Sequence, residues 1–563
     1  MFLDIETKRK MNPAAVQDNG AVLTYGELTG FAREALNDLP YRSLVFILCK
    51  NTIGSIAGYI AIMTAGCVPL LLGADIDREL LQNLISTYDP DYIWMPQADV
   101  GPDVDHWNSN TPGGTSSEAI AERDAETARQ TEAAKRNAAK KASSRTGMTV
   151  NVTPKTSGEV VMDRYDYDMI RLKPIDEIER LTGYKVGEML KGSEDGTELA
   201  GSESNNSSDR AKASAGAGSQ NHRLHPELGL LMTTSGSTGS PKLVRQSLKN
   251  VIVNAAAIGD YLEIGEFDRA ITTLPMSYTY GLSVINSHIM TGATLLLTDL
   301  SIMQREFWTF FNKEKATSIA GVPYTYEMLK KLKFMNMMLP SLKVMTQAGG
   351  RLRPDLHKEF AEFADQTRRR FYVMYGQTEA TARMSYVPYV KSVEKCGSIG
   401  VAIPGGKLSI IDESGNIIEK SHVAGELIYE GSNVTYGYAT QLSDLAKGDE
   451  NKGVLHTGDM AEMDDDGYFY IVGRKKRFLK IYGNRVGLDE CESLIENHFQ
   501  VECACTGEDD LMKIYVTGKI GEAVIIDFIA EKTALNPKAF EVHEIEKIPR
   551  SGSGKKAYGE LEG

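Results

Sequence analysis

Residues 233–242 read Thr233-Thr-Ser-Gly-Ser-Thr-Gly-Ser-Pro-Lys242, a run of hydroxyl side chains and glycines that ends in a lysine. The backbone N–H groups and hydroxyls of such a run can surround phosphate oxygens, and the lysine adds a positive charge beside them. The run is not a Walker motif, because the order G-x-x-x-x-G-K-[ST] is absent and no Ser or Thr follows Lys242. We therefore predict a phosphate-binding loop of another type.

The stretches on either side of this loop predict regular structure. Residues 228–232 form a short apolar run typical of a buried strand, and residues 248–258 have the pattern of a helix. A solvated Ser/Gly linker is the alternative interpretation of a glycine-rich run met alone. A strand, a glycine-rich loop and a helix in succession instead indicate a nucleotide site.

The composition bounds the class of protein. A chain of 563 residues is too long for one small core, so we expect two or three domains. The hydrophobic content of 42% and the charged content of 25% are typical of a soluble globular protein. The net charge of -14 argues against a nucleic-acid partner. No apolar run is long enough to form a transmembrane segment and the first residues lack a signal-peptide pattern, so we expect a cytoplasmic protein.

The six cysteines are scattered and do not have the spacing of a zinc site or the density of a disulfide scaffold. Cys503 and Cys505 are separated by one residue, so they form either a redox or metal pair or two small apolar residues of one strand. We expect reduced thiols.

Strand and helix patterns alternate from residue 19 to residue 95 and again after residue 228. Helix-length patterns occur at 53–65 and 78–88. Alternation of this kind predicts parallel sheets with helical crossovers, and frequent turn residues after Cys396 indicate an antiparallel region. The strand patterns lie at 44–49, 68–72, 92–95, 271–274, 293–297, 318–322, 344–347, 371–375 and 425–429.

The composition changes between about residues 98 and 223, where large apolar side chains become rare. A capping-box pattern opens a candidate helix at 115–142, and Pro174 opens a second, shorter one that ends near Gly183. We predict an insertion into the sheet domain that is tolerated at its surface. It is either a module that binds an unknown protein or a weakly ordered excursion.

Six further segments carry side chains that suit a nucleotide and an acid. Tyr375, Thr378 and Glu379 place an aromatic face, a hydroxyl and a carboxylate in one turn, which suits a base, a phosphate and a magnesium ion. Residues 347–352 form a second glycine turn, where a flat ring could lie against the backbone. The other four are 456–460 with Asp459 for ribose hydroxyls, the basic hinge region 466–485, the aromatic strand-to-helix connection 274–281, and the glycine loop 549–555 with Lys555.

Each of these segments alone has a simpler interpretation. Asp466 and Gly467 are most simply a hairpin turn, Asp459 a loop carboxylate, and Lys555 a solvated charge near the end of the chain. Their occurrence together and in this order is what indicates a single site.

This set of motifs resembles the adenylate-forming superfamily of acyl-CoA synthetases, nonribosomal-peptide adenylation domains and firefly luciferases. The resemblance covers nearly the whole chain except the insertion. It implies an α/β fold with a large N-terminal AMP-binding domain at 1–473, made of parallel and mixed sheets with helices plus a β-barrel-like part and interrupted at about 98–223. It also implies a small, mobile α+β C-terminal domain at 474–563 that carries the catalytic lysine.

The resemblance assigns roles to individual residues. Lys555 matches the lysine that bridges the substrate carboxylate and the α-phosphate, Glu379 the magnesium ligand, and Lys476 the hinge. Thr234 in the phosphate loop and Lys480 beyond the hinge complete the candidate catalytic set. The candidate nucleotide contacts are Thr233, Thr234, Ser235, Gly236, Ser237, Thr238, Gly239, Lys242, Gly349, Gly350, Arg351, Tyr375, Gly376, Gln377, Thr378, Glu379, Asp459, Arg474 and Lys555.

The implied activity is an ATP-dependent, AMP-forming ligation of a small-molecule carboxylic acid to a thiol, with Mg²⁺ and coenzyme A. The alternatives are loading of a phosphopantetheine arm on a separate acyl carrier protein, and a non-catalytic scaffold that uses the insertion. The aromatic and methionine-rich surroundings suggest an apolar or aromatic acyl group, although core packing explains them equally well. The candidate substrate pocket consists of Tyr278, Tyr280, Gly281, Ala348 and Met374.

Two departures from the family pattern bear on the second half-reaction and on the acid. Tyr278 stands where many acyl-CoA synthetases carry histidine, so the second half-reaction is expected to be shaped differently. No aspartate that could anchor an amino-acid ammonium group is evident in 274–281, which disfavours an α-amino acid.

Overall fold

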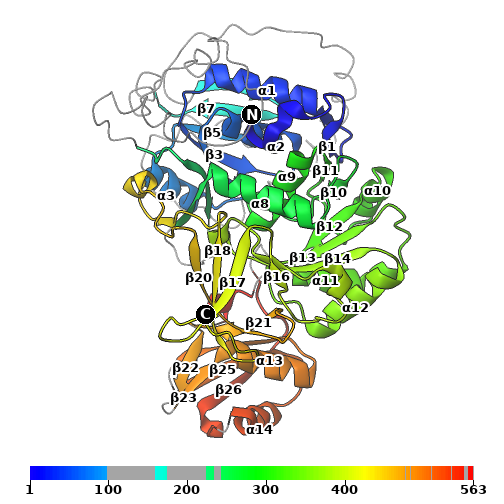
Figure 1. Ribbon diagram of the computed structural model, residues 1–563, viewed down its shortest axis with the longest axis vertical. Helices are drawn as coiled ribbons and strands as arrows, with labels where there is room; N and C mark the ends of the chain where they lie inside the picture. The colour runs from blue at the N-terminus through cyan, green and yellow to red at the C-terminus, as the bar shows by residue number, and fades with distance from the viewer. Residues whose placement is uncertain are drawn as a thin grey trace, which may run out of the picture.

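The computed structural model describes residues 1–97, 159–173, 223–233, 242–475, 477–481, 484–508, 510–533, 535–550 and 556–561. These residues form a large domain with three sheets and a small domain with two, joined after residue 474 (Figure 1). The expected α/β class is confirmed. The candidate helices at 115–142 and 174–183 and the greater part of the predicted insertion lie outside the described residues.

One sheet of the large domain is built on the first predicted α/β region. β3 pairs in parallel with β4 and β5, and β4 pairs in parallel with β8, as the alternation predicts. The crossover helices are α2 (Ile53–Thr64), between β3 and β4, and α3 (Arg78–Tyr88), between β4 and β5, whereas α1 (Tyr25–Asp38) precedes β3. In spatial order its strands are β19 (Tyr438–Ala439), β9 (Leu243–Ser247), β8 (Leu228–Thr233), β4 (Val68–Gly73), β3 (Leu44–Cys49), β5 (Tyr92–Pro96), β7 (Tyr167–Arg171) and β6 (Glu159–Arg164).

A second sheet contains most of the strands expected after residue 228, and neighbouring strands from β11 to β14 are parallel. Its helices are α8 (Leu248–Tyr261), α9 (Thr279–Thr291), α10 (Arg305–Lys313), α11 (Pro323–Lys331) and α12 (Pro354–Gln366). In spatial order its strands are β16 (Val401–Ala402), β15 (Ser385–Tyr386), β14 (Arg370–Tyr375), β13 (Val344–Gln347), β12 (Ser318–Gly321), β10 (Arg269–Ile271), β11 (Thr294–Leu297), β1 (Pro13–Gln17) and β2 (Val22–Thr24).

Helices α8 and α9 pack against each other and lie between these two sheets (Figure 1). One side of α8 contributes Val251 and Ala255 to the core that contains α1 and α2. Its other side contributes Ile258 and Tyr261 to a core that contains strands β12, β13 and β14. Because both sides of the helix are covered, its position relative to both sheets is set by close packing.

The third sheet of the large domain is antiparallel, as expected after Cys396. Gly467 has φ +82° in the connection between its last two strands, so the expected hairpin turn at Asp466–Gly467 is confirmed. Its strands are β17 (Gly406–Ile411), β18 (Gly425–Gly431), β20 (Val454–Met463) and β21 (Phe469–Arg474).

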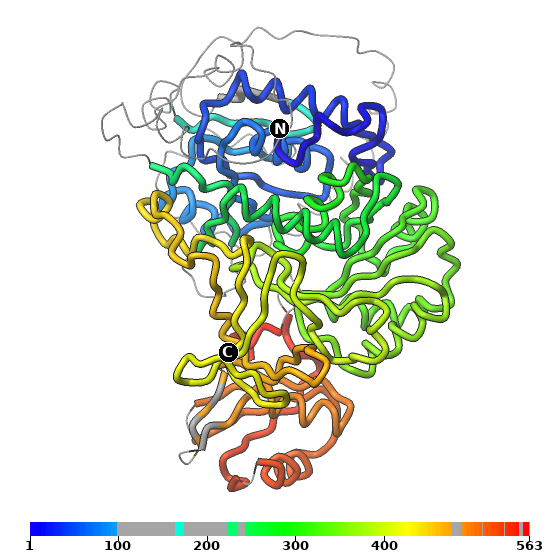
Figure 2. The backbone as a smooth tube through the Cα atoms, viewed as in Figure 1, coloured from blue at the N-terminus to red at the C-terminus, as the bar shows by residue number. Residues whose placement is uncertain are grey.

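The small domain has its own hydrophobic core and follows directly from β21. Figure 2 traces the chain into this domain, in orange and red, and back towards the junction with the large domain. Cys503 and Cys505 are buried neighbours in its core, so they are apolar strand residues. Its elements are β22 (Phe478–Ile481), β23 (Asn484–Gly487), α13 (Leu488–Phe499), β24 (Cys503–Glu508), β25 (Leu511–Thr517), α14 (Glu522–Thr533) and β26 (Phe540–Ile545).

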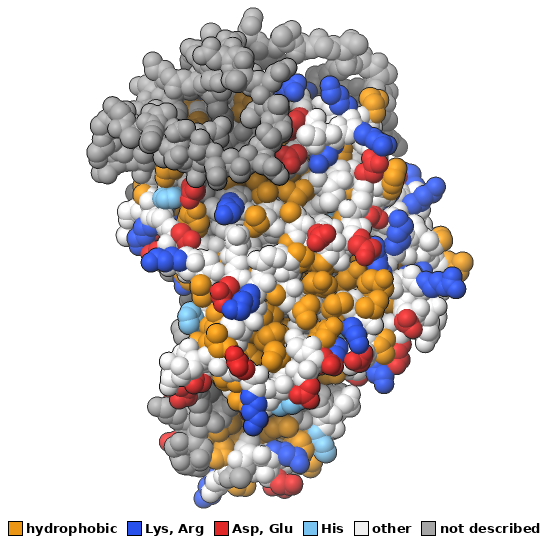
Figure 3. All heavy atoms as spheres, in the orientation of Figure 1, with side chains coloured by type: hydrophobic (Ala, Val, Ile, Leu, Met, Phe, Trp, Pro, Cys, Tyr) orange, Lys and Arg blue, Asp and Glu red, His pale blue; other side chains and the backbone are white. Residues whose placement is uncertain are grey.

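Short 3₁₀ segments complete the described structure. They are η1 (Phe2–Thr7), η4 (Phe334–Asn336), η5 (Thr378–Ala380), η6 (Tyr389–Lys391), η7 (Leu442–Ala446), η8 (Pro537–Ala539) and η9 (Tyr558–Glu560). Among the described helices, none has both the length and the apolar character needed to cross a bilayer. On the face drawn in Figure 3, basic and acidic side chains lie interspersed over the described residues.

Two expectations about the large domain need correction. The sequence predicts a helix as the next element after the phosphate loop, whereas β9 lies between them and pairs antiparallel with β8. Strand β10 ends at Ile271 instead of residue 274, and beyond it side-chain hydroxyls contact the neighbouring segments: Thr272 donates to Thr298 O at 3.0 Å, and Thr273 donates to Ala320 O at 2.5 Å.

The predicted insertion is also more closely tied to the sheet than its composition suggests. Strand β7 pairs with β5, and Tyr167 stacks on Trp94 with ring centroids 5.5 Å apart. Lys173 and Arg223 both contact the buried Asp91 carboxylate, at 3.0 and 2.7 Å. Residues 159–173 are therefore part of the sheet domain, and the chain leaves and returns beside Asp91.

Two buried histidines make the large domain sensitive to acid. Burial lowers the pKa of His288 and of His357 to about 4, from an ordinary value of 6.5. His357 accepts a hydrogen bond from the Gly397 N–H and donates one to Ser392 Oγ, both at 3.1 Å. The unfolded chain therefore takes up these protons at higher pH than the folded protein does, and stability is complete above pH 6.5 and falls as the pH decreases towards 4.

We expect the free energy of unfolding to decrease between pH 6.5 and 4 by on the order of 3 kcal/mol for each of these histidines. His357→Gln can keep both hydrogen bonds without binding a proton, so its stability should depend less on pH over this window. Urea unfolding at several pH values measures this difference. The exposed His422, changed to Asn, is the control, and equal pH profiles for His357→Gln and wild type would contradict the prediction.

Candidate active site

The expected adenosine contacts come together where β14 ends and β20 pairs with β21. The register of these two strands places Asp459 opposite Arg474, and Arg474 Nε lies 3.0 Å from Asp459 Oδ1. Asp459 Oδ2 accepts hydrogen bonds from the Tyr375 hydroxyl and, at 2.9 Å, from Gln377 Nε2. The nearly buried carboxylate of Asp459 thus accepts from three side chains, one of which is the aromatic Tyr375.

This arrangement keeps Tyr375 protonated. Burial, together with the negative charge of Asp459, raises the pKa of Tyr375 well above its ordinary value. The phenol therefore serves as a donor that fixes the orientation of its own ring. A fixed aromatic face beside an acceptor-rich carboxylate can hold a purine and the hydroxyls of its ribose.

The turn after Tyr375 brings a second group of predicted residues to the phosphate loop. The Tyr438 hydroxyl donates to Glu379 Oε1 at 2.6 Å, and Lys242 Nζ lies 3.2 Å from the centroid of the Tyr438 ring. Burial and the Glu379 charge raise the pKa of Tyr438. The carboxylate of Glu379 is therefore placed next to the end of the loop, although residues 234–241 lie outside the described part of the chain.

Helix α9 begins beside this turn. Thr279, its first residue, has its hydroxyl oxygen 2.9 Å from that of Thr378. The N-terminus of a helix offers free N–H groups and a partial positive charge, which favour a phosphate. Thr378 is thereby held at the start of α9, and its contact with an α-phosphate stays a prediction.

Two glycines allow the close approach of backbone at this site. Gly349 has φ +86°, and an added Cβ would lie 2.5 Å from the Tyr278 hydroxyl oxygen. An added Cβ at Gly376 would lie 1.7 Å from the carbonyl oxygen of Ala382. No larger residue fits at either position without a shift of the backbone or of Tyr278.

The predicted pocket residues also converge. Tyr280, Ala348 and Met374 are buried in one hydrophobic cluster, and Tyr278 packs against it. The Tyr280 hydroxyl donates to Thr346 O at 2.9 Å, which joins α9 to β13. An added Cβ at Gly281 would lie 2.3 Å from Pro275 O, so this residue lets the first turn of α9 pack tightly.

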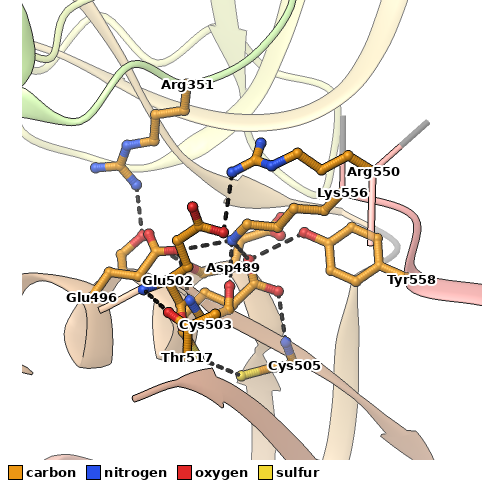
Figure 4. Close-up of polar contacts among 12 residues, drawn as sticks. Arg351, Asp489, Glu496, Glu502, Cys503, Cys505, Thr517, Arg550, Lys556 and Tyr558 are labelled. Atoms are coloured by element: carbon orange, nitrogen blue, oxygen red, sulfur yellow. Dashed lines mark hydrogen bonds and ion pairs between the residues drawn. The ribbon is translucent and has the colours of Figure 1, made fainter. Parts of the chain in front are cut away.

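The small domain contacts the large domain through charged and polar side chains (Figure 4). Arg351 Nη1 donates to Ser493 Oγ at 2.7 Å, and Arg550 lies between Glu327 at 3.8 Å and Glu502 at 3.3 Å. Arg351 thus contacts the small domain in this structure, and its contact with the nucleotide stays a prediction.

The residue after the predicted catalytic lysine is firmly held. Lys556 Nζ lies 2.8 Å from Glu492 and 2.9 Å from Glu496, and Tyr558 donates to Glu492 at 3.1 Å (Figure 4). These contacts anchor one end of the glycine loop on α13. Lys555 and the predicted hinge Lys476 lie outside the described residues, and Lys480 falls in β22.

Sequence reasoning missed two residues of the site. Thr279 lies inside the aromatic segment 274–281, of which only the neighbouring residues were predicted to belong to the site. Tyr438 lies in a stretch that has no motif of its own, so no signal in the sequence pointed to it.

The fold and the site define a nucleotide-binding α/β enzyme with a small second domain. The chain belongs to the AMP-binding enzyme family, whose model matches residues 4–439. The resemblance to adenylate-forming enzymes is thereby confirmed.

Curated relatives cover part of the chain. The 2-succinylbenzoate–CoA ligase of Bacillus licheniformis is 28% identical over 339 residues, which are 58% of this chain and 68% of the relative. The 4-hydroxybutyrate–CoA ligase 1 of Metallosphaera sedula is 28% identical over 340 residues, 57% of this chain and 59% of the relative. The matched segment therefore spans about two thirds or less of these relatives.

Solved structures share the fold over nearly the full length. o-Succinylbenzoate CoA synthetase from Bacillus subtilis, in complex with its acyl-adenylate intermediate, superposes with a TM-score of 0.66 at 18% identity, covering 98% of this chain and 95% of that one. ATP-bound MatB from Rhodopseudomonas palustris gives a TM-score of 0.65 at 19% identity, covering 99% and 97%.

Asp459 is the acceptor around which the Tyr375 cluster is built, so we expect Asp459→Ala to weaken ATP binding by roughly 10- to 100-fold through the loss of a charge-assisted acceptor. Isothermal titration with ATP measures the change. Asp465→Ala alters an exposed carboxylate of the same hairpin and should leave the affinity unchanged. Equal affinities for Asp459→Ala and wild type would show that this carboxylate does not hold the nucleotide.

Proposed function

We propose that the protein is an ATP-dependent, AMP-forming carboxylate–CoA ligase that activates a carboxylic acid as an acyl adenylate and transfers the acyl group to a thiol. The observation that carries this proposal is the cluster of Tyr375, Asp459 and Arg474 next to the turn that carries Thr378 and Glu379, together with Lys242 on the ring of the tyrosine that binds Glu379. Relatives named as CoA ligases, and a neighbour solved with an acyl adenylate, support the reaction class.

The first half-reaction brings two anions together. A substrate carboxylate attacks the α-phosphate of ATP and pyrophosphate leaves, so the site must neutralise charge and align the groups. In this proposal Thr378 and the N-terminus of α9 hold the α-phosphate, Lys242 contacts the leaving phosphates, and Lys555 bridges the carboxylate and the α-phosphate. The Tyr375 cluster fixes the adenosine so that these groups meet in line.

Glu379 fits a magnesium ion, because Mg²⁺ bound to ATP needs one or two carboxylates in addition to phosphate oxygens and water. When bound, the ion supplies charge neutralisation at the phosphates. The Tyr438 hydroxyl holds the Glu379 carboxylate in one orientation.

The second half-reaction uses the energy of the mixed anhydride. A thiol attacks the acyl carbon and AMP leaves, which requires that the Lys555 loop no longer block the acyl group. The junction between the domains relies on the contacts of Arg351 and Arg550, which a rotation can break at little cost because they are largely polar. Coenzyme A is the proposed acceptor.

The decisive test of adenylation is acid-dependent exchange of pyrophosphate into ATP. We expect Lys555→Ala to reduce exchange by about 10²- to 10³-fold, since it removes one charged group from the transition state, while ATP binding persists. Lys547→Ala, an exposed lysine of the same segment, is the control. No exchange by wild type with any acid of a broad panel, despite bound ATP, would refute the proposal.

Tyr438 offers a second test through its hydrogen bond to Glu379. Tyr438→Phe removes the hydroxyl and keeps the ring below Lys242, so we expect about 10-fold slower exchange and a higher magnesium concentration for half-maximal rate. Titration of the exchange rate with Mg²⁺ measures both. Tyr436→Phe, which removes a neighbouring hydroxyl bonded to Glu227, is the matched control.

The acceptor is tested separately. Single-turnover transfer from the enzyme-bound acyl adenylate to coenzyme A and to a holo acyl carrier protein, offered in competition, distinguishes the two thiols. Preferential transfer to the carrier would replace coenzyme A in the proposal.

A further inference from the structure

Arg383 is a buried cation in the interior of the large domain. The residue is 1% exposed, and its guanidinium carbon lies 4.3 Å from the centroid of the Tyr280 ring. Nη1 donates to the Tyr261 hydroxyl at 3.2 Å and Nη2 to Ser283 Oγ at 3.0 Å. Its side chain thus reaches between α8 and α9, next to the predicted pocket residue Tyr280.

The charge of Arg383 is not balanced by the residues around it. Among the described residues, no carboxylate lies within 4.0 Å of its guanidinium nitrogens, and its Nε is buried without a hydrogen-bond partner. A buried guanidinium that lacks a counter-charge is costly to desolvate. Its retention in the core is explained if an anion joins it when the protein binds its ligand.

Arg383 lines a cavity between α8, α9 and strands β10, β12 and β13. The walls are mainly apolar side chains, among them Ile258, Leu262, Val284, Ile319 and Val344. The cavity has a volume of about 20 Å³, enough for about one water molecule, so a substrate group can enter it only if the surrounding side chains move.

The other polar residues of this cavity are already satisfied or neutral. Asp268 accepts from the Gly265 N–H at 2.9 Å and lies 3.4 Å from Lys343, and Arg370 pairs with Glu263 at 2.6 Å. His288 donates from Nδ1 to Val284 O and is uncharged, because burial lowers its pKa to about 4. Arg383 is left as the group in the cavity that can attract an anion.

We propose that Arg383 binds a second carboxylate of the acid substrate, so that the enzyme activates a short dicarboxylic acid. This inference rests on the proposed carboxylate–CoA ligase function and names its substrate class. Nε and Nη2 share one edge of the guanidinium group, the edge that can hold both oxygens of a carboxylate. Nε is free and Nη2 has a further N–H beyond the one given to Ser283.

The position of Arg383 limits the length of the acid. Thr279 marks the reacting end, because its hydroxyl meets that of Thr378, and Ser283 marks the Arg383 end of the same helix. Four residues of α-helix span about 6 Å. The two carboxylates are therefore separated by a few carbon atoms, and a long-chain acid does not fit this spacing.

The test compares acids of equal chain length in the pyrophosphate exchange assay with the full-length wild-type protein. The panel contains malonic, succinic, glutaric and adipic acids, each beside the unsubstituted monocarboxylic acid and the ω-hydroxy acid of the same length. We expect kcat/KM for the best dicarboxylic acid to exceed that of its two partners by at least about 10-fold, since a pocket built to bind a polar group rejects analogues that lack it.

Two variants then assign this preference to Arg383. Arg383→Met removes the charge at similar size and should lower kcat/KM for the dicarboxylic acid by about 100-fold while changing that for the monocarboxylic acid by no more than about threefold. Arg383→Lys keeps the charge but loses the paired N–H groups of the guanidinium. Its kcat/KM for the dicarboxylic acid should therefore lie between those of wild type and Arg383→Met. Arg353→Met, which removes an arginine paired with Asp355 on the surface, is the control. Retained ATP binding shows that each variant is folded.

The outcomes separate this inference from the function on which it rests. Exchange with monocarboxylic or hydroxy acids in preference to dicarboxylic acids upholds the ligase and overturns the role of Arg383. A dicarboxylic preference that survives in Arg383→Met also overturns it. If Arg383→Met does not fold, the ranking of acids by wild type decides alone. No exchange with any acid, while ATP binds, removes both the proposed function and this inference.

Discussion

The packing of α8 and α9 between two sheets is the constraint on which the arrangement of the site depends. Both sides of α8 are buried, and its polar residues fasten loops from elsewhere in the chain. Asn250 donates to Ser432 O and Val434 O at 2.7 and 2.9 Å, and Asn254 donates to Arg383 O at 2.9 Å. The turn that contains Thr378 and Glu379 is therefore held against a helix that cannot shift without disturbing two cores.

The same packing produces two contrasting buried charges. Asp459 lies near the surface of the fold among three donors, so its burial is compensated within the protein. Arg383 lies deeper and contacts hydroxyls and an aromatic face, which satisfy part of its hydrogen-bonding capacity and leave its charge without a partner. The first charge is compensated by the protein itself, and the second is the one that our proposal pairs with a carboxylate of the substrate.

Much of the fold could be predicted from local sequence, because many of its strands and helices have a clear hydrophobic periodicity. Strands β3 and β13 and helix α3 have the bounds that periodicity predicts, and each is flanked by turn or capping residues. Strand β9 was missed because Arg245 and Gln246 make it look like an exposed segment. Both are buried, and Arg245 donates to the carbonyls of Tyr436, Tyr438 and Lys447, which come 191, 193 and 202 residues later.

By itself the sequence determined the class of the protein and the order of its α/β units, and it indicated glycine, aromatic and acidic residues as candidates for a nucleotide site, since motifs and periodicity are local properties of the chain. Only the tertiary structure decided that Tyr438 holds Glu379, that Lys173 and Arg223 meet at Asp91, and that Arg383 faces an apolar cavity without a counter-charge. These are relations between residues far apart in sequence, and their strength depends on burial and on distance, which the order of residues alone does not contain.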